Sequence, residues 1–167
     1  MRRIFVAAGI SAFAFCLAAG SASTARAQDA VKRGKYLAAV MDCAGCHTNG
    51  ALAGKPDSKL HLAGSDIGFG MPGFGVFYPP NLTPDPESGL GRWSEADIVK
   101  ALRTGVRPDG RELAPVMPWR SYAALTETDA RALAAYLKSL PPVAHQVPPI
   151  AGPDGKAPAP YLAVVTP

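Results

Sequence analysis

The stretch Cys43-Ala44-Gly45-Cys46-His47 has the spacing of a c-type haem attachment site. Two cysteines three residues apart present their thiols on one side of a helical turn, where each can form a thioether with one vinyl group of the haem. His47 follows directly and can bind the iron as the proximal ligand. Ala44 and Gly45 are small, so a flat porphyrin can approach this backbone closely. The motif therefore predicts one covalently bound haem c, with its iron bound by His47.

Two other kinds of site also use a Cys-x-x-Cys pair. A thioredoxin-like redox pair requires a βαβ setting, which the pattern of this chain lacks. A structural zinc site needs four ligands, and only His61 and His145 remain as further histidines, with no second Cys-x-x-Cys in the sequence. A visible absorption spectrum separates haem from zinc at once.

The segment before the motif is typical of a secretory signal peptide. Two arginines at positions 2 and 3 precede an apolar run over residues 4–19, and Ala25-Arg26-Ala27 forms an A-x-A cleavage site. We expect residues 1–27 to be removed near Ala27 and the protein to be periplasmic. The alternative is an uncleaved membrane anchor, for which the apolar run is somewhat short.

Loss of this leader changes the charge of the chain. The full sequence has a formal net charge of +4, and three arginines leave with residues 1–27, so the mature chain carries +1. Two haem propionates would make it neutral or negative, so its charge gives no sign of nucleic-acid or membrane-surface binding. Cys16 leaves as well, so both remaining cysteines serve the haem and no disulfide is left to form.

The mature chain suits one domain over residues 28–142, followed by a Pro-rich extension over residues 143–167. Apolar residues at helical spacing predict helices over residues 29–42, 94–104 and 126–140. Capping patterns begin the last two helices. Gly34 lies inside the first, where glycine costs about 1 kcal/mol relative to alanine, so we predict a close helix crossing there.

The segment over residues 48–80 is irregular, because its density of glycine and proline forbids a long helix. Residues 60–62 and 75–78 are expected to pair as a small hairpin flap. Three aromatic residues either cover the haem or form a small core of the loop: Phe69, Phe74 and Phe77. The extension after residue 142 is expected to be extended or partly disordered.

The sixth ligand of the iron must come from outside the motif. Side chains of suitable chemistry are Met41, Met71, Met117, His61 and His145. We favour Met117, because Pro115 and Pro118 flank it and hold the backbone extended. A neutral thioether favours ferrous iron, which raises the reduction potential into the range of an electron carrier. Met71, which also precedes a proline, and His61 are the alternatives.

The order of helix, Cys-x-x-Cys-His, loops, Pro-Val-Met-Pro and terminal helix resembles class I c-type cytochromes over residues 29–142. Further stretches are similar to one haem module of the cytochrome c subunits of bacterial membrane-bound alcohol and aldehyde dehydrogenases. They are NLTPD (81–85), GLGRWS (89–94), RTG (103–105), DG (109–110) and PVMPW (115–119). This chain has one haem motif where those subunits carry three, and it lacks their membrane anchor. The resemblance implies an all-α fold around one haem.

In that family such modules pass electrons from a dehydrogenase towards quinone or a terminal oxidase. The resemblance thus implies a non-catalytic electron carrier whose partners are a dehydrogenase donor and an oxidase or cytochrome acceptor. A haem enzyme, peroxidase-like or thiosulfate-oxidising, is the alternative from another class. Such an enzyme needs a displaceable sixth ligand, and the loop around Met117, which we expect to hold the methionine on the iron, argues against one.

The family fold also implies contacts for several other residues. The first and last helices are expected to cross near the haem, with Gly34 and Tyr36 against Tyr136 and Leu137. Hydrogen-bond donors for the haem propionates are expected from Asn81, Arg92 and Trp93, with solvation as the alternative for Arg92. The carbonyl of Pro56 is predicted to orient the His47 ring.

Overall fold

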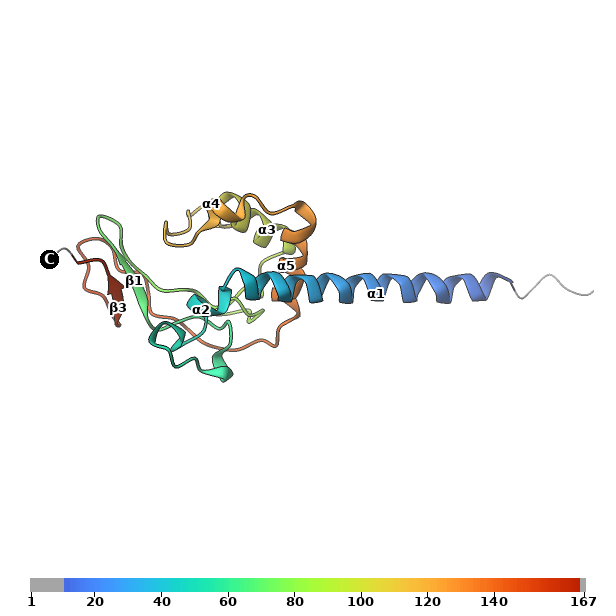
Figure 1. Cartoon of the computed structure of the whole chain (residues 1–167), viewed down its shortest axis with the longest axis horizontal. Helices are drawn as coiled ribbons and strands as arrows, with labels where there is room; N and C mark the ends of the chain where they lie inside the picture. The colour runs from blue at the N-terminus through green and yellow to red at the C-terminus, as the bar shows by residue number, and fades with distance from the viewer. Residues whose placement is uncertain (1–10, 166–167) are drawn as a thin grey trace, which may run out of the picture.

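Helices dominate the computed structural model, which describes residues 11–165 (Figure 1). The helices are α1 (Ser11–Val40), α2 (Cys43–His47), α3 (Glu95–Thr104), α4 (Trp119–Tyr122) and α5 (Glu127–Ser139). The strands are β1 (Gly68–Met71), β2 (Gly75–Phe77) and β3 (Tyr161–Ala163). Two single-turn 3-10 helices, η1 (Ala51–Ala53) and η2 (Ser58–Leu60), lie between α2 and β1. The predicted mainly helical class is confirmed, with a small sheet added.

Helix α1 is longer than the predicted first helix and projects beyond the domain at its N-terminal end (Figure 1). The predicted leader lies partly outside the described residues, and its residues 11–27 belong to α1. Its cleavage therefore stays a prediction. Between residues 11 and 165, no helix has both the length and the apolar character that a membrane span requires.

Helices α1 and α5 cross at Gly34, as the sequence predicts. A Cβ atom added at Gly34 would collide with the carbonyl oxygen of Ala132 and lie 2.6 Å from Cβ of Tyr136. Leu37 is buried on the same face of α1, three residues further on. The predicted inward position of Tyr36 is wrong: its side chain is 57% exposed, because helical spacing turns position 36 away from this face.

Replacing Gly34 with alanine is expected to lower the free energy of unfolding by about 1–3 kcal/mol, since the new methyl group meets backbone that cannot move aside. This loss exceeds the helix propensity gained, about 1 kcal/mol. Denaturant unfolding of the holoprotein measures the change. Lys35→Ala, at an exposed position of the same helix, is the control and should stay within about 0.5 kcal/mol of the parent. Equal stability of Gly34→Ala and the parent would contradict the close crossing.

The ends of α3 and α5 follow the predicted capping patterns. The Ser94 hydroxyl accepts from the backbone N–H of Asp97, whose carboxylate accepts from the Ser94 N–H in return. The Thr126 hydroxyl accepts from Asp129 N–H in the same way. Helix α3 stops at Gly105, which has a φ of 73° that favours glycine. These caps fix where the two helices begin, and α5 packs against both α1 and α3.

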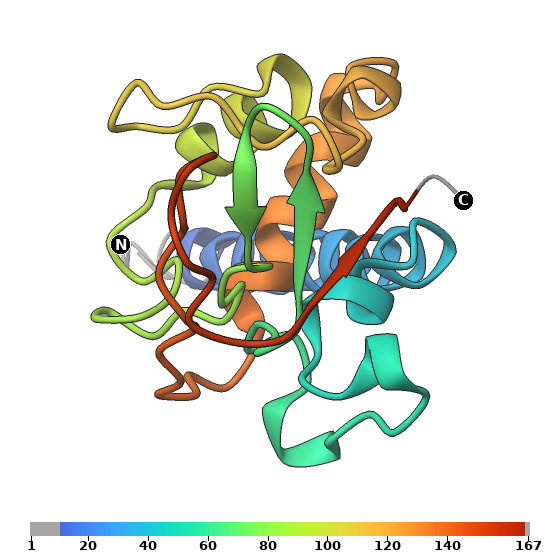
Figure 2. The same ribbon diagram turned by 90° about the vertical axis from the view of Figure 1, so that its left-hand side faces the viewer.

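The small sheet differs from the predicted hairpin in one strand. Strand β2 pairs antiparallel with β1, with Phe69 opposite Phe77. Leu60 instead ends η2, and residues 61–62 form a turn in which Leu62 has a φ of 57°. The buried Leu62 side chain belongs to the main core, a cluster that also includes Leu37, Ile98, Leu102, Leu133 and Leu137. Strand β3, from the Pro-rich extension, pairs parallel with β1. Figure 2 shows this extension, in red, running back across the hairpin.

Candidate haem site

The Cys-x-x-Cys-His motif forms its own short helix, α2, directly after α1. Asp42 separates the two helices with a left-handed backbone, φ 52°. Cys43 and Cys46 are both unpaired and half-buried. A Cβ at Gly45 would lie 2.6 Å from the Cγ of Asp42, so a side chain there would displace the Asp42 carboxylate. The motif therefore presents two free thiols on one short helix.

The thiols of this motif differ from those of a redox-active pair. Burial raises the pKa of Cys43 to about 11, and it also raises the pKa of Cys46, with the carboxylate of Asp42 adding to both shifts. Reactive dithiol pairs have lowered pKa values, because the thiolate is their nucleophile. Both thiols here are protonated at neutral pH, which does not fit a thioredoxin-like role.

His47 is buried, and its Nδ1 lies 2.8 Å from the carbonyl oxygen of Pro80. A carbonyl only accepts, so Nδ1–H must be the donor, which leaves the lone pair of Nε2 for a metal. Burial lowers the pKa of His47, although the Pro80 contact opposes this shift. The imidazole is therefore neutral, as a metal ligand must be. The prediction that Pro56 supplies this carbonyl is wrong, since Pro80 supplies it from 33 residues away.

The backbone around His47 is held by the loop over residues 62–64. The His47 carbonyl accepts from the Gly64 N–H at 2.8 Å. The Thr48 hydroxyl accepts from the Leu62 N–H at 3.1 Å, and the Leu62 carbonyl accepts from the Leu82 N–H at 2.8 Å. The ring and the backbone of His47 thus depend on two different loops, which Leu62 and Leu82 join.

Met117 lies in the loop between α3 and α4. Its side chain is half-buried and packs against the main core. The expectation that the flanking prolines hold this backbone extended is wrong: Met117 N–H donates to the Ala114 carbonyl at 2.9 Å, which closes a turn. Trp119, just beyond, packs its ring against Gly105 at the end of α3. The turn and this contact fix the position of the Met117 side chain relative to α3.

The other candidates for the sixth ligand differ in what surrounds them. His61 is exposed, and Met71 ends strand β1 with a half-buried side chain. Met41 packs against the main core. His145 has both ring nitrogens engaged, with Nδ1 2.8 Å from the Ala63 carbonyl oxygen and Nε2 3.3 Å from the Asp66 carboxylate.

The three residues expected to contact the propionates lie in different environments. Asn81 is 1% exposed and donates through Nδ2 to the Ser88 hydroxyl and the Val143 carbonyl. Arg92 is exposed and paired with Glu87. The Trp93 ring lies under the Arg107 guanidinium, 5.2 Å from its carbon. Their propionate contacts stay predictions, and Asn81 would have to exchange an existing bond to make one.

The arrangement of these groups fits a covalently held haem. Two unpaired thiols and a neutral imidazole of fixed tautomer occur within five consecutive residues, and the thioether of Met117 is a soft axial ligand of suitable chemistry. Across residues 11–165, His, Cys, Asp and Glu side chains form no group of three that could hold a metal ion.

The cytochrome c family model matches residues 31–141. The chain belongs to the cytochrome c family. Covalently bound haem c belongs to that family, and Cys43, Cys46 and His47 lie inside the matched range.

Similar proteins include cytochrome subunits of several dehydrogenases. The cytochrome c subunit of a quinone alcohol dehydrogenase from Gluconobacter oxydans is 41% identical over 140 residues, covering 81% of this cytochrome and 27% of the relative. The fructose dehydrogenase cytochrome subunit from Gluconobacter japonicus is 37% identical over 131 residues, covering 78% of this cytochrome and 24% of the relative. The gluconate 2-dehydrogenase cytochrome c subunit from Pantoea cypripedii is 40% identical over 127 residues, covering 75% of this cytochrome and 25% of the relative. The cytochrome thus spans about a quarter of the length of these relatives.

Two features of the site had no signal in the sequence. The Pro80 carbonyl is one, because any backbone carbonyl can accept and nothing local marks which will reach His47. The other is the set of contacts from the extension to Asn81 and Ala63. In the sequence, the nearest hint is the asparagine that directly follows Pro79 and Pro80.

Proposed function

We propose that this cytochrome carries one haem c and transfers single electrons as a subunit or partner of a dehydrogenase. The observation that supports it best is the buried, neutral His47, held by the Pro80 carbonyl beside two unpaired thiols. The relatives are named as cytochrome subunits of dehydrogenases, so an electron carrier is favoured over a haem enzyme. Export by a cleaved leader would put this activity in the periplasm.

Each residue of the site has a defined task in this proposal. Cys43 and Cys46 hold the haem covalently, so it stays in place through every redox cycle. His47 binds the iron through Nε2, while the Pro80 carbonyl fixes the ring and increases the basicity of the imidazole. Met117 is our proposed sixth ligand. The bound haem supplies the ferric/ferrous couple, and no proton has to move for an electron to pass.

Electron transfer also needs a surface where a partner can come close to the haem. Phe74, at the hairpin turn, is 58% exposed, and Val116 in the methionine loop is 40% exposed. The guanidinium of Arg120 lies 4.4 Å from the ring of Trp119. Redox partners usually meet through small, transient interfaces. We infer that these apolar groups frame the haem edge and carry the docking, since a nearly neutral chain gains little from long-range steering.

Stopped-flow reduction of the ferric cytochrome by its dehydrogenase tests this surface. Val116→Ala and Phe74→Ala are each expected to slow reduction, Phe74→Ala by about tenfold, because an interface depends on a few central residues that exclude water. The visible spectrum should stay unchanged in both. Ile150→Ala, which removes an exposed apolar side chain of the extension, is the matched control and should react at the parent rate. Unchanged rates in both loop variants, or a steep fall of the rate with salt, would contradict the docking surface.

A further inference from the structure

The extension that follows the matched family range returns to the domain at Val143. The Val143 carbonyl accepts from the Asn81 Nδ2 at 2.7 Å, and the Val143 N–H donates to the Thr83 hydroxyl at 3.1 Å. Thr83 in turn donates to the Asn81 Oδ1 at 2.7 Å. Asn81 and Thr83 are both buried. This part of the extension therefore completes a closed set of hydrogen bonds directly beside Pro80.

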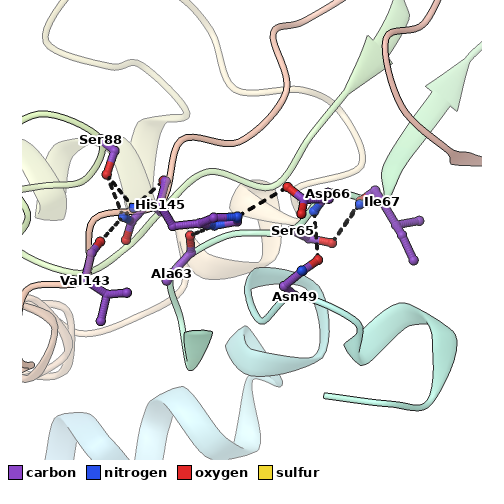
Figure 3. Close-up of polar contacts among 9 residues, drawn as sticks. Asn49, Ala63, Ser65, Asp66, Ile67, Ser88, Val143 and His145 are labelled. Atoms are coloured by element: carbon purple, nitrogen blue, oxygen red, sulfur yellow. Dashed lines mark hydrogen bonds and ion pairs between the residues drawn. The ribbon is translucent and has the colours of Figure 1, made fainter. Parts of the chain in front are cut away.

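Two residues further on, His145 joins the extension to a second loop (Figure 3). Its N–H donates to the Ser88 hydroxyl at 3.1 Å, and its ring Nδ1 donates to the Ala63 carbonyl at 2.8 Å. Its Nε2 lies 3.3 Å from the Asp66 carboxylate, and the ring is mostly buried. His145 thus bridges the loop that carries Ser88 and the loop over residues 63–66.

These two loops are the ones that support His47. Pro80, which accepts from the His47 ring, is next to Asn81, which Val143 holds. Gly64, which donates to the His47 carbonyl, is next to Ala63, which His145 holds. Each support of the ligand is therefore one residue away from a contact made by the extension.

The rest of the extension serves a different part of the molecule. Ala151 pairs with Val76 on β2, the Tyr78 hydroxyl donates to the Ala159 carbonyl at 2.7 Å, and β3 pairs with β1. These contacts fix the hairpin. The hydrogen bonds among them begin after Pro148. Val147, which packs against Gly64 and the Val76–Tyr78 cluster, stays in a chain that ends at Pro148, so that cut removes the hairpin hydrogen bonds and keeps Val143 and His145.

We propose that Val143 and His145 form a clamp that positions His47, by holding the Pro80 and Gly64 loops on its two sides. Val143 and His145 are positioning residues, since they act through these loops and contact neither the imidazole nor the haem. The clamp keeps the bond from His47 Nδ1–H to Pro80 closed, which maintains the basicity of the ligand and stabilises ferric iron. The inference rests on the proposed role of His47 as the haem ligand.

The test measures how fast the His47 Nδ1 proton exchanges with deuterium, by NMR of the ferric holoprotein. In a chain that ends at Pro142 we expect exchange to be about tenfold or more faster, because the closed state has lost its supporting hydrogen bonds. A chain that ends at Pro148 keeps Val143 and His145, and should exchange at the parent rate. The backbone amides of α5 are measured in the same samples as a report on global stability.

Point variants in the full chain carry the same test if the shorter chain fails to fold. His145→Phe removes the contacts to Ala63 and Asp66 and should speed the exchange of the His47 proton about tenfold. His145→Gln keeps a side-chain donor and should restore part of the protection. The matched control is His61→Phe, at an exposed histidine of the neighbouring turn, which should leave exchange unchanged.

Two results would overturn the clamp. One is faster exchange of the His47 proton and the α5 amides by the same factor, which would mean general destabilisation. The other is unchanged exchange in both the chain ending at Pro142 and His145→Phe. Failure of the proposed function has a separate signature: the His47 ring proton of the unaltered ferric protein would show no paramagnetic shift, whatever happens in the variants.

Discussion

Replacing Cys43 and Cys46 together with alanine is expected to abolish covalent haem attachment completely. Both thiols are unpaired and lie on one short helix, so each is available to one vinyl group. With both thioethers gone, the haem is held only by its axial ligands and by packing, and these are lost when the chain unfolds. Acidic acetone should then extract all of the haem, whereas the unaltered protein should keep its colour on the denatured polypeptide.

The single variants are the matched controls for this experiment. Cys43→Ala and Cys46→Ala each leave one thioether, so both should retain haem after denaturation. Retention of haem by the double variant would contradict the assignment of the motif. Replacing Cys43 should also weaken the fold, because its side chain packs against the main core.

Local signals explain which parts of the fold the sequence predicts well. The caps at Ser94 and Thr126 are short patterns whose hydrogen bonds join residues three apart, and α3 and α5 begin where they indicate. Gly34 is unfavourable within a helix unless another backbone comes close, so it predicts the crossing with α5. Helical spacing also places Tyr36 outward, because the buried face of α1 here is formed by Gly34, Leu37 and Ala38, and position 36 lies on the opposite side of the helix.

The parts that the sequence does not predict depend on contacts between distant segments. The pattern of residues 60–62 favours a hairpin strand, but the left-handed backbone of Leu62 and its burial in the core place it in a turn. The acceptor for His47 lies at Pro80, since the loop folds back over the ring. The ordered path of the extension follows from Asn81 and Tyr78, whose partners are more than 60 residues away. No pattern within a short window encodes such pairs.

The buried Asn81 shows how sequence similarity and geometry can suggest different roles for one residue. It belongs to a stretch that resembles a haem module, which suggests a propionate contact. Its Nδ2 donates to Ser88 and Val143, and its Oδ1 accepts from Thr83. A buried amide with these partners is costly to rearrange, because an unmade hydrogen bond loses about 1–3 kcal/mol. Holding Val143 in the clamp therefore explains more of the hydrogen bonds of Asn81 than a propionate contact would.

The second large effect is expected from Met117→Ala. A thioether is neutral and favours ferrous iron, so its loss should lower the reduction potential by on the order of 0.1 V, a part of the range of about 0.8 V that axial ligands span. The weak far-red absorption band of ferric methionine-ligated haem should disappear. The open position should then bind carbon monoxide in the ferrous state and cyanide in the ferric state.

Two companion variants decide whether this effect belongs to Met117. Met71→Ala changes the other methionine that precedes a proline, and His61→Ala removes the exposed histidine; both should keep the band and the potential of the parent. The backbone turn at Met117 depends on its own N–H, which alanine retains, so the loop should survive the change. Because Met117→Ala loses the ligand and keeps this turn, any change in its spectrum or potential reports the loss of the thioether alone. If the spectrum of Met117→Ala is unchanged, the sixth ligand is instead the residue whose variant alters it, Met71 or His61.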